Sequence, residues 1–460
     1  MASCTSPLDG ARYSDWRDDN PAQWHISNSG SLHSPDTLLS QAATLDEGTA
    51  PGKHDLTADM AAEDYVVLAL QRSPAIRASR HAVERLRSRL PQVTALDDPM
   101  FQMAPFGEMA QTASGEVTVM TGVSQRLPYP GKLATRGRIA EQDVAMALAD
   151  LRQTELQVAA DTRQAYWSYY FAIRAIETTG ESRSLLVQFK EIAEAQYRAG
   201  TRTQSDVLRA SVELSNLDQE LIVLAQRHAT ARSMLNQLLD RPTNAAIPEP
   251  APIALRDIIG DLDDFLAGAA RDNPAVRKVY ERIEQARERQ SLARLSRRPD
   301  LTVSANYNVV ADHGLSRAAD GEDQWWFGFG INIPLWNAKY DAAEQEALES
   351  LMVGVADLST VRNRIAFQVN DAFLRVEAKR DLIEMFRDVI VPQARQTVEA
   401  SASGYRAGSV DFLTLIDNWR KLLSFDIMYH RALADMEQAI ADLERAIGAD
   451  VTRQNQEQAQ

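Results

Sequence analysis

Four long stretches of the chain combine helical hydrophobic spacing with an absence of glycine and proline. Apolar residues recur every three or four positions, as at Leu217, Leu221 and Leu224, which is the spacing of helices packed side by side. The stretches cover residues 138–179, 201–241, 355–391 and 409–447. A helix of about 40 residues spans roughly 60 Å, and one over 133–198 would approach ~100 Å. A soluble coiled-coil bundle would show the same pattern.

Two pairs of segments between the helices alternate apolar residues with polar or small ones, less regularly in the first segment than in the other three, which predicts β-strands. They are residues 100–106, 117–124, 301–309 and 325–333. Nine or ten residues is the length of a tilted strand that crosses a bilayer, although a half-buried sheet of a soluble domain alternates as well. An aromatic face beginning at Trp325 and an opposite face with Gly328 and Gly330 favour the membrane interpretation.

An internal duplication organises the chain. The tetrad Tyr197–Gly200 recurs as Tyr405–Gly408, 208 positions later. Ordered matches at nearly that offset join Gln164–Tyr166 to Asp371–Phe373, Gly122 and Pro128 to Gly328 and Pro334, and Ser73–Arg77 to Asn273–Arg277. The predicted parts are a flexible arm (1–57), a first repeat (58–245; strands about 99–107 and 116–127, helices 132–241), a Pro-rich linker (246–256), a second repeat (257–448; strands about 300–311 and 324–334, helices 338–447) and a polar tail (449–460).

Four strands cannot close a barrel, and lipid does not tolerate open sheet edges. If the strands span a membrane, several chains must therefore share one barrel, and three chains would supply twelve strands. The fold class expected from the pattern is mainly α with a small β part.

Composition narrows the function classes. The net charge of −15 argues against binding nucleic acid. A single cysteine, Cys4, excludes an internal disulfide framework and a multi-cysteine metal site. The chain has no standard catalytic motif, so we expect neither an enzyme nor a cofactor. No signal peptide is visible at the start; Cys4 is a lipid-anchor candidate, or equally an ordinary exposed cysteine.

The two strand-pair and long-helix halves, with their repeated Tyr-Arg-Ala-Gly turns, resemble the TolC family of outer-membrane efflux proteins over about residues 60–448. The resemblance implies a homotrimer with a twelve-stranded barrel in the outer membrane and an α-helical tunnel through the periplasm. It implies as partners a periplasmic adaptor, an inner-membrane transporter of the RND type, and outer-membrane lipid. The competing hypothesis is a soluble, elongated helical scaffold.

The repeated turns are where the resemblance places function. In that family they form the periplasmic tip, where the adaptor docks and the tunnel closes. The docking candidates are Tyr197, Arg198, Gly200, Tyr405, Arg406 and Gly408, and the gate candidates are Arg202, Asp206 and Tyr405. Val410 stands where the best-studied member has a gating arginine, so we expect apolar contacts or an Arg202–Asp206 arrangement instead.

The same resemblance marks two further features. Gly180 and Pro392 lie at nearly equivalent positions, and both residue types can break or kink a helix. The run Leu127–Leu133 looks like the branch that accompanies heavy-metal pumps, of the copper/silver or cobalt-zinc-cadmium type. Thioethers suit soft ions such as Cu(I), although methionine is also an ordinary apolar residue of strands. The weak metal-ligand candidates are Met100, Met103, Met109 and Met120.

Overall fold

The computed structural model describes residues 60–106, 110–250, 260–313 and 319–451, together with residues 56, 256, 258, 315 and 317. Cys4, Met109 and nearly all of the expected N-terminal arm lie outside this part of the chain. Within it, no helix carries an apolar stretch long enough to span a bilayer.

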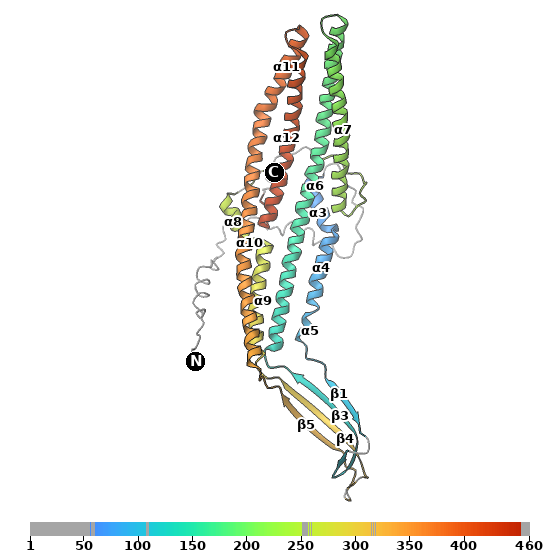
Figure 1. Ribbon diagram of the computed structural model, residues 1–460, viewed down its shortest axis with the longest axis vertical. Helices are drawn as coiled ribbons and strands as arrows, with labels where there is room; N and C mark the ends of the chain where they lie inside the picture. Colours follow the sequence, from blue (N-terminus) through green and yellow to red (C-terminus); the bar gives the residue numbers. More distant parts are fainter. Residues whose placement is uncertain are drawn as a thin grey trace, which may run out of the picture.

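The chain forms a long helical body with a sheet at one end (Figure 1). The first half contains α3 (Ala62–Arg72), α4 (Pro74–Arg87), α5 (Leu90–Thr94), β1 (Met100–Pro105), β2 (Gln111–Thr112), β3 (Gly115–Leu127), α6 (Lys132–Arg198) and α7 (Gln204–Leu238). The second contains α8 (Leu262–Asp272), α9 (Pro274–Leu295), β4 (Leu301–Ala311), β5 (Gln324–Ile331), α10 (Asn337–Met385), η1 (Phe386–Ile390), α11 (Val391–Ala407) and α12 (Phe412–Ile447). The duplicated order of helices, strands and long helices is confirmed.

The longest helix, α6, has 67 residues and is therefore ~100 Å long. It continues through Gly180, so the predicted break at this position is wrong. Glycine keeps its backbone N–H and costs a helix only about 1 kcal/mol relative to alanine, and the rest of α6 outweighs that cost.

The second half does depart from α-helical geometry at the expected place. A π-helical turn, η1, separates α10 from α11, and Pro392 follows it in the first turn of α11. Proline has no N–H to give to the preceding turn. A wider turn just before proline is one way in which the helix accommodates this missing donor.

The sheet joins the two repeats. Its order is β1-β3-β4-β5, with β2 paired to β3, and all pairs are antiparallel. The central β3–β4 ladder connects the repeats, and β1 and β5 form the two edges. The strand β5 ends at Ile331 rather than near 334, because Pro334 cannot donate to a ladder.

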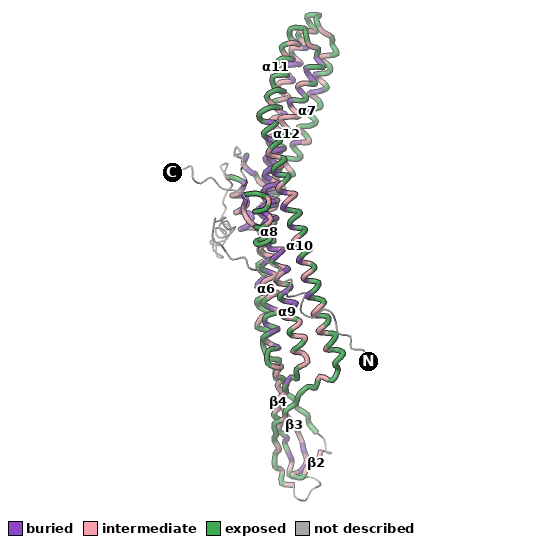
Figure 2. The backbone as a smooth tube through the Cα atoms, turned by 90° about the vertical axis from the view of Figure 1, so that its left-hand side faces the viewer, coloured by how far each residue is buried: buried purple, intermediate pink, exposed green. Residues whose placement is uncertain are grey.

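The repeats also interleave in the helical body. Helix α6 packs against α7, α9 and α12, so it contacts elements from both halves. Three hydrophobic clusters hold the body together: one around α3 and α6, one beside it around α8, α9, α10 and α12, and one near the far end of the helices. Figure 2 shows the buried residues concentrated in the middle of the helical body, with exposed residues prevailing at its far end and on the outer turns.

Candidate functional site

The two repeated turns lie together at the end of the helical body away from the sheet, which we call the helical tip (Figure 1). One turn joins α6 to α7 and the other joins α11 to α12. Gly200 and Gly408 have φ angles of 72° and 84°, a left-handed conformation that favours glycine at helix ends. Asp411 caps α12: its carboxylate accepts from the Thr414 N–H at 2.8 Å.

All three gate candidates meet at the helical tip and connect the two hairpins. The Tyr405 hydroxyl donates to Asp206 Oδ2 at 3.2 Å. The Arg202 guanidinium carbon lies 5.2 Å from the centre of the Tyr405 ring, and Arg202 Nη2 donates to the Val410 carbonyl at 2.9 Å. Among the described residues, Arg202 forms no ion pair with Asp206. Arg202 and Asp206 instead both contact Tyr405, which lies between the two charges.

Tyr405 is completely buried and its ring packs 5.3 Å from that of Phe412. Burial, with the nearby Asp206 carboxylate, raises the pKa of Tyr405 above its usual range. The phenol therefore stays protonated and remains a hydrogen-bond donor at physiological pH.

The docking candidates differ in exposure. Tyr197, Arg198 and Gly200 are exposed in the first turn, and Arg406 and Gly408 in the second. Tyr405 lies inside the chain, so it offers no surface to a partner, and its place among the docking candidates is corrected. The two copies of the tetrad thus place the same side chain in opposite environments, since 46% of Tyr197 is exposed.

Two further contacts at the helical tip were not singled out from the sequence. Gln196 Nε2 donates to the carbonyls of Tyr405 and Arg406, each at 3.3 Å. Arg420 on α12 donates through Nε to Glu213 on α7 at 3.0 Å, and Glu213 is buried. Both contacts join residues about two hundred positions apart, so no local signal could reveal them.

The methionine candidates do not converge on one site. Met100 pairs with Ser124 and Met120 with Ala104, so both side chains lie on the polar face of the sheet. Met103, three residues from Met100, lies on the opposite face. Met120 pairs with Ala104, and Ala104 is four residues along β1 from Met100. At about 3.3 Å per residue, the backbone positions of Met100 and Met120 are thus ~13 Å apart along the strand. Within the described chain, no cluster of three His, Cys, Asp or Glu residues is placed to hold a metal.

A buried corner fixes the sheet to the helices. Lys132 Nζ donates to Asp300 Oδ1 at 2.7 Å, and the Tyr129 N–H donates to the same oxygen at 2.9 Å. Arg126 donates to the other oxygen at 2.6 Å. Burial would raise the pKa of Asp300, but the hydrogen bonds from Lys132, Tyr129 and Arg126 outweigh it and hold the pKa at about 2. The end of β3 and the starts of α6 and β4 thus share one carboxylate.

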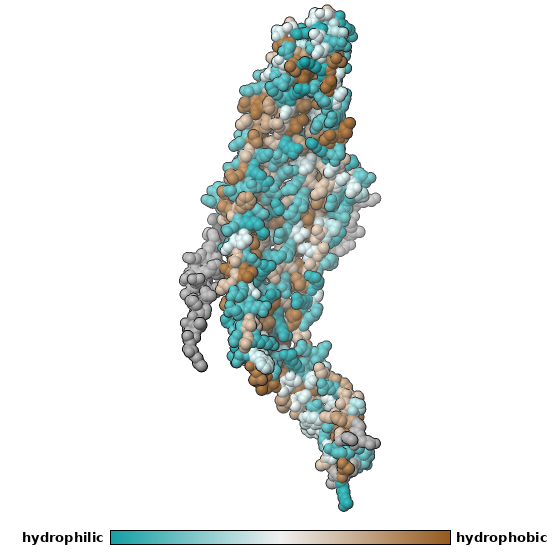
Figure 3. All heavy atoms as spheres, viewed as in Figure 1, coloured by the Kyte–Doolittle hydropathy of each residue, from teal (hydrophilic) through white to brown (hydrophobic). Residues whose placement is uncertain are grey.

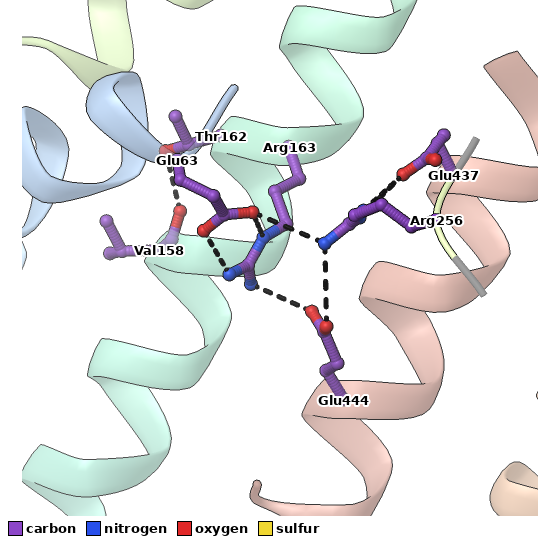
Figure 4. A network of polar contacts seen from close by, with 7 residues as sticks. All are labelled: Glu63, Val158, Thr162, Arg163, Arg256, Glu437 and Glu444. Atoms are coloured by element: carbon purple, nitrogen blue, oxygen red, sulfur yellow. Dashed lines mark hydrogen bonds and ion pairs between the residues drawn. The ribbon is translucent and has the colours of Figure 1, made fainter. Parts of the chain in front are cut away.

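A second buried network lies midway along the body (Figure 4). Arg163 on α6 binds both oxygens of Glu63 at 2.8 and 2.6 Å and lies 3.1 Å from Glu444. Arg256, in the link between the repeats, lies 2.6 Å from Glu437 and 3.7 Å from Glu444. Three carboxylates therefore surround two guanidinium groups. Burial raises the pKa of Glu444 to about 7, whereas Arg163 outweighs burial at Glu63 and keeps that pKa below its usual value.

Comparison with known proteins places this geometry in a family of transport proteins. The model of the family described as outer membrane efflux protein matches residues 65–241 and 266–449, one segment for each repeat. The chain belongs to the outer membrane efflux protein family. It is an outer-membrane efflux channel that extends into the periplasm, and the hypothesis of a soluble scaffold is set aside.

Individual relatives are distant in sequence and close in fold. The chain is 22% identical to the cobalt-zinc-cadmium resistance protein CzcC of Cupriavidus metallidurans, over 69% of this chain and 74% of that protein. It is 20% identical to the toluene efflux pump outer membrane protein TtgI of Pseudomonas putida, over 74% and 70%. The crystal structure of the outer membrane protein VceC from Vibrio cholerae superposes with a TM-score of 0.71 at 19% identity, covering 85% of this chain and 96% of that one.

Proposed function

We propose that three copies of the chain form the passive exit duct of a tripartite efflux pump. The observation that carries this proposal is the pair of free sheet edges, β1 and β5. An open edge in lipid leaves backbone groups unpaired at a cost of several kcal/mol each, and pairing β5 of one chain with β1 of the next removes both edges. Three such pairings close a barrel of twelve long strands.

Exposed apolar residues on α10 support the same assembly. Val353, Phe367 and Leu374 are 59%, 68% and 52% exposed, and their spacing in multiples of seven places them along one seam of the helix. A neighbouring chain would cover this seam and extend the helical body into a closed tunnel.

The helical tip is the proposed periplasmic entrance. Tyr405, Asp206 and Arg202 hold the two hairpins of one chain together and would resist their separation, which makes them the proposed gate. The exposed Tyr197, Arg198, Gly200, Arg406 and Gly408 would form the docking surface for a periplasmic adaptor. An inner-membrane transporter of the RND type would supply the energy, and the channel itself would catalyse no reaction.

The cargo is proposed to be heavy-metal ions. The likeness to a cobalt-zinc-cadmium resistance protein supports this class, and the likeness to a toluene efflux protein supports organic compounds as the second candidate. The separated methionines favour no metal site in a single chain. Selection of the cargo would therefore lie with the transporter.

Three experiments test these proposals. Native mass spectrometry of the protein extracted from membranes in mild detergent should show a trimer, and planar bilayers should show discrete channels; a monomer that stays in solution without detergent would contradict the assembly. Loss of the gene should sensitise cells to copper, silver, zinc, cobalt or cadmium salts. Sensitivity to toluene alone would replace metals by organic compounds as the cargo.

A further inference from the structure

The segment between β5 and α10 presents three large apolar side chains to the outside. Ile333, Leu335 and Trp336 are 67%, 70% and 76% exposed. Pro334 ends the ladder, and two tight backbone hydrogen bonds follow, from Leu335 N to the Ile333 carbonyl at 3.0 Å and from Asn337 N to the Leu335 carbonyl at 3.2 Å. The backbone is thus folded into turns while the side chains point outward. We call Ile333–Trp336 the corner segment.

The equivalent corner of the first repeat is folded inward. There Tyr129 is half-buried and Lys132 is buried against Asp300. A strand-to-helix corner can therefore form in this fold without exposing large apolar side chains. Their exposure is particular to the second repeat.

The corner segment continues the outer apolar face of the sheet. Phe327, Phe329 and Ile331 alternate along β5 and are 67%, 77% and 63% exposed. Ile333 and Leu335 are also exposed and follow shortly after the last paired residue of β5. Figure 3 shows hydrophobic surface where α10 meets the sheet. The apolar surface that would contact acyl chains therefore extends past the end of β5 into the corner segment.

Positive charge borders this apolar surface. Arg298 and Lys339 are exposed on either side of the sheet-to-helix junction, and neither forms an ion pair with an acid in the described chain. The nearest carboxylates on α10, Asp341 and Glu344, are both bound by Arg297. Lys339 Nζ lies 5.6 Å from the centre of the Tyr340 ring, a contact that leaves its charge uncompensated by an acid. Apolar side chains beside cations that no described acid neutralises match the boundary between acyl chains and anionic headgroups.

We propose that the corner segment inserts into the periplasmic leaflet of the outer membrane, and that Arg298 and Lys339 bind the phosphates of anionic phospholipids there. The contact sets the depth of the barrel in the bilayer. This inference rests on the proposed barrel, and conductance of the same preparation reports on that barrel separately.

Nitroxide labelling of the full chain tests the insertion. In a Cys4→Ser background, Trp336→Cys is labelled and reconstituted into vesicles of phosphatidylcholine with phosphatidylglycerol. Phe329→Cys is the lipid-facing reference, and Leu315→Cys, 91% exposed at the other end of the sheet, is the aqueous reference. The label at 336 should collide with oxygen more than with a water-soluble nickel chelate, as at 329.

Two other results would overturn the insertion. A label at 336 that behaves as at 315 lies in water. A label shielded from both oxygen and nickel is covered by a second copy of the chain. Channel conductance in the same vesicles would show that the barrel has formed, even if the corner segment stays out of the lipid. If the parent protein shows no conductance, the proposed barrel itself is contradicted.

Lipid selection is tested by neutralising the two cations. Arg298→Gln and Lys339→Gln should each weaken retention of phosphatidylglycerol about fivefold, measured by native mass spectrometry with mixed-lipid nanodiscs. Arg277→Gln, at another exposed arginine, on α9, whose side chain is 74% exposed, is the matched control. Equal retention by all three variants would remove the proposed phosphate contacts.

Discussion

At the residue scale, burial separates the two copies of the repeated tyrosine. Tyr405 is enclosed and hydrogen-bonded to Asp206, whereas Tyr197 is half exposed. The identical tetrads cannot separate them, because the difference arises from surrounding residues, both Phe412 of the same hairpin and residues of the opposite hairpin. Arg202 and Gln196 reach Tyr405 and its carbonyl from some two hundred positions away.

Tyr405→Phe should loosen the proposed gate. It removes the hydroxyl donor and leaves Asp206 without this partner, at a cost of about 1–3 kcal/mol. Single-channel recordings should show higher conductance or more frequent opening. Tyr197→Phe is the control and should conduct like the parent, and identical recordings from both variants would count against a gating role for Tyr405.

The buried network around Glu444 predicts a dependence of stability on pH. Its pKa of about 7 exceeds the ordinary 4.5, so between these values the folded chain keeps a proton that the unfolded chain has lost. The free energy of unfolding from this group should be highest below about pH 4.5 and fall by about 3 kcal/mol as the pH rises to 7.

Unfolding at a series of pH values checks this sign. Glu444→Gln should flatten the decline, because glutamine cannot titrate. Glu63→Gln acts in the opposite sense: the pKa of Glu63 is lowered, so its stabilisation is present above the unfolded pKa and disappears as the pH falls. An unchanged slope in Glu444→Gln would exclude Glu444 as the titrating group.

At the element scale, two glycines of the long helical hairpins have different roles. Gly408 occupies a left-handed turn, with a φ angle of 84°, while Gly180 is an ordinary residue inside α6. The Pro- and Gly-free stretches predict the helices well, and period-two alternation predicts the strands, because both signals are local. The course of α6 through Gly180 follows from the small cost of one glycine relative to the many helix-forming residues around it.

The two glycines should respond oppositely to substitution. Gly180→Ala should stabilise the protein by about 1 kcal/mol, since the added methyl group meets no atom within 4 Å. Gly408→Val should destabilise the turn by about 1–2 kcal/mol and weaken efflux while trimers persist. Thermal unfolding and an efflux assay check both variants. Loss of trimers in Gly408→Val would place the turn in assembly rather than at the entrance.

The strand register also explains why Met100, Met103 and Met120 do not form the metal site that their clustering in the sequence suggested. Strand alternation alone places Met100 and Met103 on opposite faces, so their separation could be predicted from their spacing in the sequence. The distance between Met100 and Met120 required the pairing of β1 with β3. Clustering in sequence is a poor guide to clustering in a sheet.

At the scale of the whole molecule, the exposed seam on α10 should determine assembly. Phe367→Glu places a charge in the centre of that seam and should shift trimers toward monomers by at least tenfold in apparent dissociation constant, since burying an unpaired charge costs several kcal/mol. Native mass spectrometry measures the shift. Leu315→Glu, exposed in the distal loop, is the control, and equal trimer fractions would move the interface elsewhere.

The joining of two repeats in one chain has a consequence for how such a protein can evolve. If six repeats form the complete wall, half of the joints between neighbours lie within a chain and half lie between chains. The within-chain joint contains β3 and β4, the corner at Asp300 and the Tyr405–Asp206 contact. Mutations can tune this joint without weakening the other, so the opening of the entrance and the cohesion of the assembly are free to change independently.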